Sequence, residues 1–142
     1  MKELIVNVSG KTYPIHIESG ILKKLPDVFK EKYSGKKLAV VSDDIVFNIY
    51  GNTFVNNLQQ KGFFVTPIIF EAGEKSKNLN TLNEIFNALA DNAFTRSDIV
   101  VALGGGVTGD MAGLAAAIFL RGMRFIQIPT TLLAMVDSSI GG

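Results

Sequence analysis

A glycine-rich segment from Gly104 to Asp110, with the sequence GGGVTGD, is the strongest sign of chemistry in this chain. It separates a stretch typical of a buried strand from a stretch typical of an apolar helix. Glycines at such a turn let backbone N–H groups approach an anion closely, and the helix N-terminus adds partial positive charge. The segment therefore predicts a phosphate-binding turn, although tight packing of the strand against the helix would also favour glycine.

The same segment satisfies the dinucleotide-binding pattern G-x-G-x-x-G at Gly104, Gly106 and Gly109. This pattern carries little weight alone, and a Rossmann site usually has an acidic residue about twenty positions later. Arg121 and Arg124 occupy that region instead. Two interpretations remain open, namely a different kind of dinucleotide site and a coincidence.

Asp43 follows a buried strand and could bind a cofactor. A carboxylate in that position can accept hydrogen bonds from a ribose 2′-hydroxyl and would repel a 2′-phosphate, which favours NAD over NADP. The same carboxylate could instead cap the helix that follows. Both interpretations of Asp43 stand equally well on the sequence.

Asp110 and Arg121 flank the apolar segment from Ala112 to Leu120. An acidic residue in the first turn of a helix and a basic residue near its end often only complement the helix dipole. The segment is so apolar that we expect its helix to be buried, with both charges where solvent meets the core. For each residue, a functional and a structural role remain open.

Three further polar segments follow expected strands. The alternating charges of 71–77 are typical of a solvated loop, and 137–139 indicates a turn. Pro129-Thr130-Thr131 is typical of a helix start capped by a hydroxyl. His16 alternates onto the polar face of a strand, so we expect it to lie at the surface without a function.

The composition excludes several classes of protein. The 142 residues include 14 Lys and Arg against 13 Asp and Glu, so no strong field favours nucleic acid or an anionic membrane. With no Cys and a single His, we expect no metal site within the chain. Neither a signal peptide nor an apolar run of membrane-spanning length is evident, so we expect a cytoplasmic protein.

Hydrophobic periodicity predicts an α/β domain with a Rossmann-like, doubly wound and mostly parallel sheet. An N-terminal β-hairpin, 4–8 and 13–17, precedes the alternating elements. The expected strands are 37–42, 63–70, 98–103 and 124–128, and the expected helices are 22–33, 44–61, 79–92 and one ending at 120. The chain ends at Gly141-Gly142 with an element still in progress, so we expect a fragment of a longer protein.

Several motifs together resemble the 3-dehydroquinate synthase family. They are GGGVTGDMAG at 104–113, Arg121-Gly122, and QIPTTLLAMVDSSIGG at 127–142. The hairpin, the Ser42-Asp43 strand end and 73–77 occur in the family order, so the resemblance covers essentially the whole chain. We therefore expect residues 1–142 to be an N-terminal NAD-binding domain whose helical second domain is absent.

The resemblance implies a lyase of the shikimate pathway, which serves aromatic amino-acid biosynthesis. Such an enzyme converts a sugar-acid phosphate, 3-deoxy-D-arabino-heptulosonate 7-phosphate, to 3-dehydroquinate and phosphate. Transient oxidation by NAD precedes phosphate elimination, re-reduction and aldol closure. The family also implies a homodimer and a zinc or cobalt ion in the second domain.

The resemblance assigns roles to particular residues. It implies that Asp43 binds the adenosine ribose and that Asp137 reaches the substrate hydroxyls. It places Arg121 at the substrate phosphate, from the same subunit or a neighbouring one. The remaining cofactor-binding residues that it implies are Glu74, Lys77, Gly105, Gly106, Val107, Asp110, Thr130 and Thr131.

Two departures from the family pattern matter. Ile45 stands where members often carry Asn, which removes one polar contact to the cofactor. The family also continues from Gly141-Gly142 into a Lys that contacts cofactor and substrate, and its metal ligands, one Glu and two His, lie in the second domain. We therefore expect no turnover from this chain alone.

Two alternatives compete with this interpretation. An NAD-dependent polyol dehydrogenase of the glycerol dehydrogenase type would share the cofactor domain, but it needs no phosphate-elimination residues around Arg121-Gly122 and 130–137. A free-standing nucleotide-binding module would be expected to close its last element. Hydride transfer from glycerol without phosphate release would favour the dehydrogenase. A reading frame that continues into a Lys and a later set of one Glu and two His would favour the synthase over the free-standing module.

Overall fold

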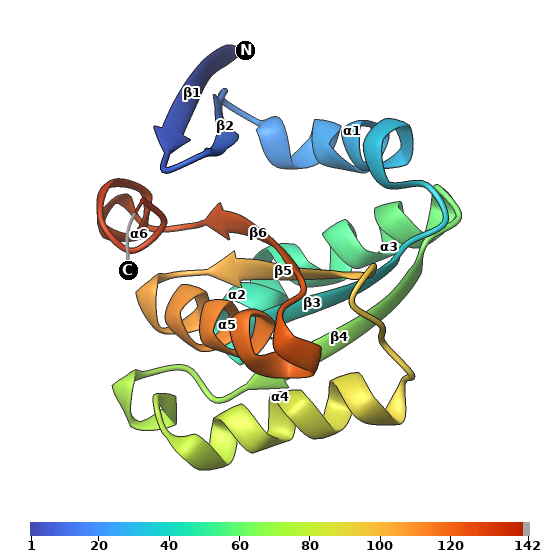
Figure 1. The fold of residues 1–142 in the computed structure, drawn as a ribbon, viewed down its shortest axis with the longest axis vertical. Helices are drawn as coiled ribbons and strands as arrows, with labels where there is room; N and C mark the ends of the chain where they lie inside the picture. The colour runs from blue at the N-terminus through green and yellow to red at the C-terminus, as the bar shows by residue number, and fades with distance from the viewer. Residues whose placement is uncertain (141–142) are drawn as a thin grey trace.

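The computed structural model describes residues 1–140 and shows the expected α/β architecture, with helices on both faces of a parallel sheet (Figure 1). The sheet has four strands in the order β4-β3-β5-β6, and every neighbouring pair is parallel. Its strands are β3 (Lys37–Asp43), β4 (Phe64–Phe70), β5 (Ile99–Gly104) and β6 (Arg124–Pro129). All four strands therefore end at one edge of the sheet, called here the carboxyl edge.

The helices alternate with these strands as the periodicity predicted. They are α1 (Ile21–Tyr33), α2 (Asp44–Val46), α3 (Asn52–Gln60), α4 (Leu79–Asp91), α5 (Gly106–Ile118) and α6 (Leu132–Val136). Short turns of 3-10 helix, η2 (Glu74–Ser76) and η3 (Phe119–Arg121), precede α4 and follow α5. None of the helices within residues 1–140 is long and apolar enough to cross a membrane.

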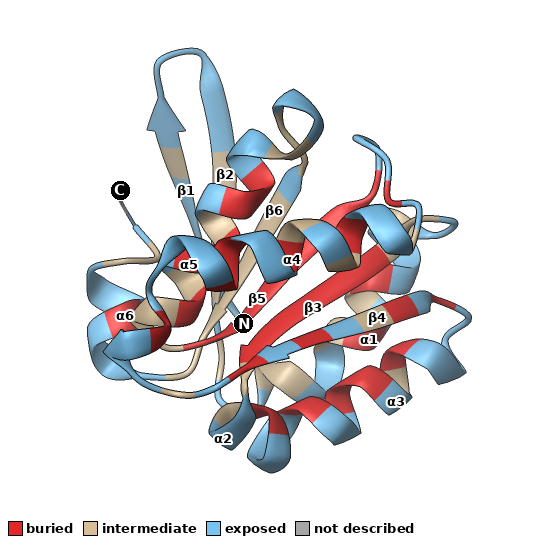
Figure 2. Cartoon of the chain, turned by 90° about the horizontal axis from the view of Figure 1, so that it is seen from below, coloured by how far each residue is buried: buried red, intermediate tan, exposed pale blue. Residues whose placement is uncertain are grey.

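The central strands divide two hydrophobic cores between the faces of the sheet (Figure 2). Leu38 and Val40 pack on one face with α1 and α3, whereas Ala39 and Val41 pack on the other with α4 and α5. All four side chains are fully buried. Because successive residues of a strand point to opposite faces and both faces are covered, the central residues of β3, Leu38 to Val41, are all apolar.

The N-terminal strands β1 (Lys2–Val8) and β2 (Lys11–Ile17) form the expected hairpin, paired antiparallel from Lys2↔Ile17 to Val8↔Lys11. It stands apart from the parallel sheet (Figure 1). The expectation of a surface position for His16 is only partly correct. Its side chain is 21% exposed, and Nδ1 is buried 3.9 Å from Glu3 Oε2.

Two expected helices differ in detail from the structure. The segment 44–61 contains a π-helical turn, η1 (Phe47–Gly51), between α2 and α3. Gly51 has no Cβ, and a Cβ there would overlap the Phe47 ring, so glycine allows the ring to fold back onto the helix.

The expectation of a buried helix over Ala112–Leu120 is correct only in part, because Ala112, Ala115 and Ala116 are buried but other residues of the segment are not. The α5 helix ends at Ile118, and both Leu120 and Arg121 adopt left-handed backbone angles with φ of 50° and 66°. Leu114, Ile118 and Leu120 are each about half exposed. Gly141 and Gly142, on which the expectation of a truncated chain rests, lie outside the described residues.

Candidate functional site

The strand order creates a switch point between β3 and β5 at the carboxyl edge. From β3 the chain crosses to β4 through α3 on one face, then returns to β5 through α4 on the opposite face. In open α/β sheets, the loops that leave the two central strands diverge at such a point and leave a crevice where ligands bind. Asp43 follows β3 there, and Gly105 follows β5.

A fully buried hydroxyl joins the two central strands beside this crevice. Ser42 Oγ donates a hydrogen bond to the Leu103 carbonyl oxygen at 2.7 Å. The paired residues of β3 and β5 extend only to Val41↔Ala102, so the hydroxyl satisfies an acceptor just past the end of the ladder. Ser42 is not among the predicted site residues, and the only sign of its role in the sequence is a polar residue near the end of an apolar strand.

The N-terminus of α5 lies at the crevice, and no side chain of the described residues 1–140 caps it. Gly105 is the N-cap residue in an extended conformation, and Gly106 and Val107 begin the helix. An added Cβ on Gly105 would lie 3.4 Å from Thr131 Cγ2, so this turn passes close to the β6–α6 loop. The first N–H groups of a helix lack partners within the helix and carry partial positive charge, which suits a phosphate.

Gly104 has a separate, structural reason to be glycine. A Cβ there would lie 2.5 Å from Thr108 Oγ1, and the Thr108 side chain is 1% exposed. Tight packing against Thr108 therefore explains the glycine at position 104. At Gly105, one residue later, the absence of a side chain instead leaves space for an anion to approach the N-terminus of the helix.

The two threonines after β6 lie beside the glycine-rich turn. Thr130 N donates to the Gly104 carbonyl oxygen at 2.9 Å, and Thr131 Oγ1 accepts from Ala134 N at 3.1 Å. The second contact confirms the hydroxyl cap expected for this helix start. Thr130 Oγ1 is buried and has no hydrogen-bond partner within residues 1–140. A buried hydroxyl without a partner is unusual and suits a site that a ligand completes.

Asp43 does cap a helix, as one of its two interpretations predicted. Asp43 Oδ1 accepts from Val46 N at 2.9 Å, and the residue is partly exposed at the carboxyl edge. A carboxylate has lone pairs for more than one donor. The cap is therefore compatible with a ligand hydroxyl on the same side chain.

The β4–α4 loop brings two further predicted residues to the site. Glu74 begins the η2 turn and Lys77 directly follows it, and Lys77 Nζ lies 2.7 Å from Asp110 Oδ2 on α5. The hydrogen bond and charge of Asp110, with a smaller contribution from Glu74, raise the pKa of the Lys77 amine. A cleft of about 300 Å³ opens beside this pair, lined by Lys77, Asn78, Leu79, Leu82, Asp110, Met111 and Leu114.

The two residues expected to act on substrate lie in different places. Asp137 directly follows α6 and is exposed, and an added Cβ on Gly106 would lie 3.8 Å from the neighbouring Ser138 Oγ. Arg121 follows the other end of α5, and a 13-residue helix is about 20 Å long. The chain thus brings Asp137 to the carboxyl edge but not Arg121.

Within residues 1–140, no group of three His, Cys, Asp or Glu side chains could hold a metal ion.

Known proteins are similar to this chain in sequence and in fold. The family model described as 3-dehydroquinate synthase N-terminal matches residues 67–142. The 3-dehydroquinate synthase of Clostridium acetobutylicum is 47% identical over the whole chain, which spans about 40% of that relative.

Two solved structures share the fold. The structure of 2-deoxy-scyllo-inosose synthase complexed with carbaglucose-6-phosphate, NAD+ and Co2+ has a TM-score of 0.85 at 24% identity, covering 96% of this chain and 37% of that one. The 2-epi-5-epi-valiolone synthase of Streptomyces hygroscopicus subsp. jinggangensis, with NAD+ and Zn2+ bound, has a TM-score of 0.81 at 27% identity, covering 97% and 38%. Because the family model covers more than half of the sequence, this chain belongs to the 3-dehydroquinate synthase N-terminal family.

Proposed function

We propose that residues 1–142 form the NAD-binding domain of a 3-dehydroquinate synthase. The observation that carries this proposal is the uncapped N-terminus of α5 beside the β3–β5 switch point, with Asp43 at the end of the neighbouring strand. A dinucleotide needs an anion site and a ribose acceptor at such a crevice. The relative with 27% identity, which binds NAD+, gives the proposal independent support.

The residues at the carboxyl edge fit NAD chemically. The N–H groups of Gly105, Gly106 and Val107 would bind the pyrophosphate, and Asp43 would accept from the adenosine ribose. The Thr130 hydroxyl, which has no hydrogen-bond partner among residues 1–140, could accept a hydrogen bond from a polar group of the cofactor or donate one to it. Thr131, Asp110, Lys77 and Glu74 would complete the site around the dinucleotide.

The whole enzyme would convert 3-deoxy-D-arabino-heptulosonate 7-phosphate to 3-dehydroquinate and phosphate. NAD, when bound, supplies the reversible hydride acceptor for this reaction. Asp137 would orient substrate hydroxyls near the carboxyl edge. Because Arg121 lies a helix length away, it would reach a substrate phosphate most directly in the site of a second subunit of a homodimer.

The isolated chain would not turn over substrate. With one His and no Cys, its residues do not fit the zinc or cobalt site of the family, so the metal ligands would come from a second domain. Membership in the synthase family favours this function over a polyol dehydrogenase or a free-standing nucleotide-binding module. We expect neither phosphate release nor glycerol oxidation from this chain alone.

An NMR titration of the isotope-labelled chain with NAD tests the proposal, with NADP as the control. We expect shifts confined to Asp43, Glu74, 105–110 and 130–131, and weaker shifts with NADP because Asp43 would repel its 2′-phosphate. A folded chain that shows no shifts at millimolar NAD would contradict an autonomous cofactor site. Equal shifts with both nucleotides would contradict the role of Asp43.

A further inference from the structure

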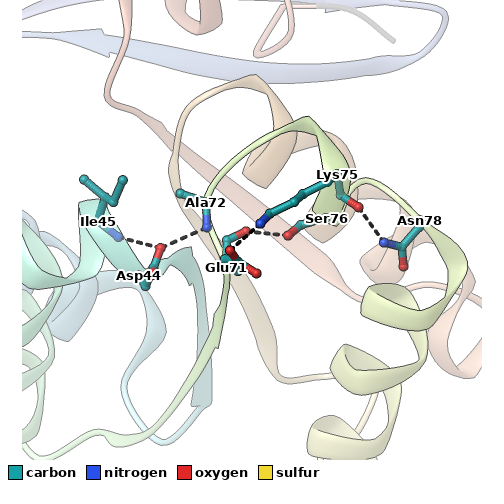
Figure 3. A network of polar contacts seen from close by, with 7 residues as sticks. All are labelled: Asp44, Ile45, Glu71, Ala72, Lys75, Ser76 and Asn78. Atoms are coloured by element: carbon teal, nitrogen blue, oxygen red, sulfur yellow. Dashed lines mark hydrogen bonds and ion pairs between the residues drawn. The ribbon is translucent and has the colours of Figure 1, made fainter.

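The loop from Glu71 to Asn78 is an internally braced unit. Ser76 Oγ donates to the Glu71 carbonyl oxygen, and Ser76 N donates to the Gly73 carbonyl oxygen at 3.1 Å. Asn78 Nδ2 donates to the Lys75 carbonyl oxygen at 2.7 Å, and Lys75 also pairs with Glu71 (Figure 3). These contacts fix the shape of the loop, but all of them lie within it. They do not determine where the loop sits relative to the rest of the site.

Asp44 supplies the connection between this loop and the end of β3. Asp44 Oδ1 accepts from its neighbour Ile45 N at 3.0 Å and from Ala72 N at 2.9 Å (Figure 3). Within residues 1–140, the contact from Ala72 N to Asp44 Oδ1 is the one hydrogen bond between the loop and residues 43–46. The opposite end of the loop is held by Lys77, through its ion pair with Asp110 on α5. The loop is therefore held at its two ends by two aspartates, Asp44 after β3 and Asp110 after β5.

The adjacent residues Asp43 and Asp44 therefore have different hydrogen-bond partners and different structural roles. Asp43 Oδ1 turns to the N–H of Val46, whereas Asp44 Oδ1 turns to the loop that follows β4. The loop itself is exposed at Glu71, and Gly73 has a φ of 116°, so packing alone does not hold its first half.

We propose that Asp44 is a positioning residue for the cofactor site, one that sets where Glu74 lies relative to Asp43. The inference rests on the proposed NAD site and names a residue outside it. The hydrogen bond from Ala72 N to Asp44 Oδ1 is called here the tether. It requires an acceptor oxygen rather than a negative charge, because both groups that donate to Asp44 Oδ1 are backbone N–H groups. An asparagine can supply the same acceptor, whereas an alanine cannot.

The experiment compares Asp44→Ala with Asp44→Asn in the isotope-labelled chain, measuring NAD affinity and the hydrogen exchange of the Ala72 amide. We expect Asp44→Ala to weaken NAD binding about five- to tenfold, the equivalent of one lost hydrogen bond. Exchange at Ala72 should accelerate in the same variant. Asp44→Asn should stay within about twofold of the wild type in both measurements, because it retains the acceptor. Asp91→Ala, which removes an exposed aspartate from the end of α4, is the matched control and should change neither.

The outcomes separate this inference from the proposed function. If the wild-type chain binds NAD and folded Asp44→Ala binds it equally well, the positioning role is wrong and the NAD site stands. If Asp44→Asn loses as much affinity as Asp44→Ala, the charge matters and the tether is again the wrong explanation. If the folded wild-type chain binds no NAD, the proposed cofactor site fails, and the positioning role fails with it.

Discussion

Lys77 Nζ and Asp110 Oδ2 lie 2.7 Å apart and join the loop after β4 to the first turns of α5. The two residues are 33 positions apart in the sequence and are each about half exposed. Asp110 raises the pKa of the Lys77 amine, so the amine is charged at neutral pH. The ion pair connects two residues that the family resemblance had assigned separately to the cofactor site.

Breaking this pair should affect cofactor binding more than folding. An exposed ion pair contributes little to stability, so Lys77→Met and Asp110→Asn should unfold at nearly the wild-type temperature. Each variant should weaken NAD binding, and the double variant should lose less than the two single losses combined, because one contact is shared. Calorimetric titration of all four proteins measures this coupling, and strictly additive losses would contradict it.

The same pair predicts how cofactor binding depends on pH. A raised lysine pKa means that the pair is fully formed below the unfolded value of about 10.4 and is lost as the pH rises through the folded value. NAD affinity should therefore be unaffected by Lys77 titration between neutral pH and about pH 9. A drop within that range that disappears in Lys77→Met would show that the amine titrates earlier than the structure implies.

Neighbouring glycines in the turn should respond differently to alanine. Gly104→Ala places a methyl against the buried Thr108 side chain and should cost about 1–3 kcal/mol of stability. Gly105→Ala meets only Thr131 at 3.4 Å and should fold normally, yet its methyl would obstruct the approach of a pyrophosphate. Thermal unfolding and NAD titration of the two variants separate these effects. Normal NAD binding by Gly105→Ala would argue against a phosphate at this turn.

Two substitutions of Asp43 separate its cap from its proposed ribose contact. Asp43→Asn retains a good N-cap residue, whereas Asp43→Ala removes the cap and should cost about 1 kcal/mol. Asp43→Asn should therefore keep its unfolding temperature while NAD affinity falls and the preference over NADP narrows. Urea unfolding and parallel titrations with the two nucleotides give the comparison. An unchanged nucleotide preference in Asp43→Asn would leave Asp43 with a structural role only.

Asp98 should stabilise the fold from the opposite edge of the sheet. Burial opposes ionisation of this carboxyl, but hydrogen bonds from Lys37 N and from Thr95 N and Oγ1 outweigh burial and lower its pKa. Its stabilisation is therefore present above the unfolded pKa of about 3.9 and is lost as the pH falls through the lower folded value.

Replacing Asp98 by alanine tests this role. Asp98→Ala should lower the free energy of unfolding by about 2 kcal/mol at neutral pH, because two backbone N–H groups lose their acceptor. The difference from the wild type should shrink below about pH 4. Denaturant unfolding at several pH values measures it, with Asp91→Ala as an exposed control. A difference that does not change with pH would contradict the ionised carboxylate.

The sequence alone determined the order and type of the main elements and the local chemistry of their ends. Apolar stretches such as 99–103 predicted buried strands because both faces of a central parallel strand are covered. The glycine-rich turn and the Thr131 cap were recognisable because each depends on residues close together in the chain. The family motif supplied the identities of most proposed site residues.

Only the tertiary structure decided which of these residues meet. The Lys77–Asp110 pair and the Asp44–Ala72 hydrogen bond each join segments that are separated by a helix and a strand, and no local pattern in the sequence encodes such contacts. The exposure of Ile118 could not be predicted from the sequence either, because the type of an apolar residue does not show whether another element covers it. Local propensity determines elements, but the packing of the sheet and its helices determines the site.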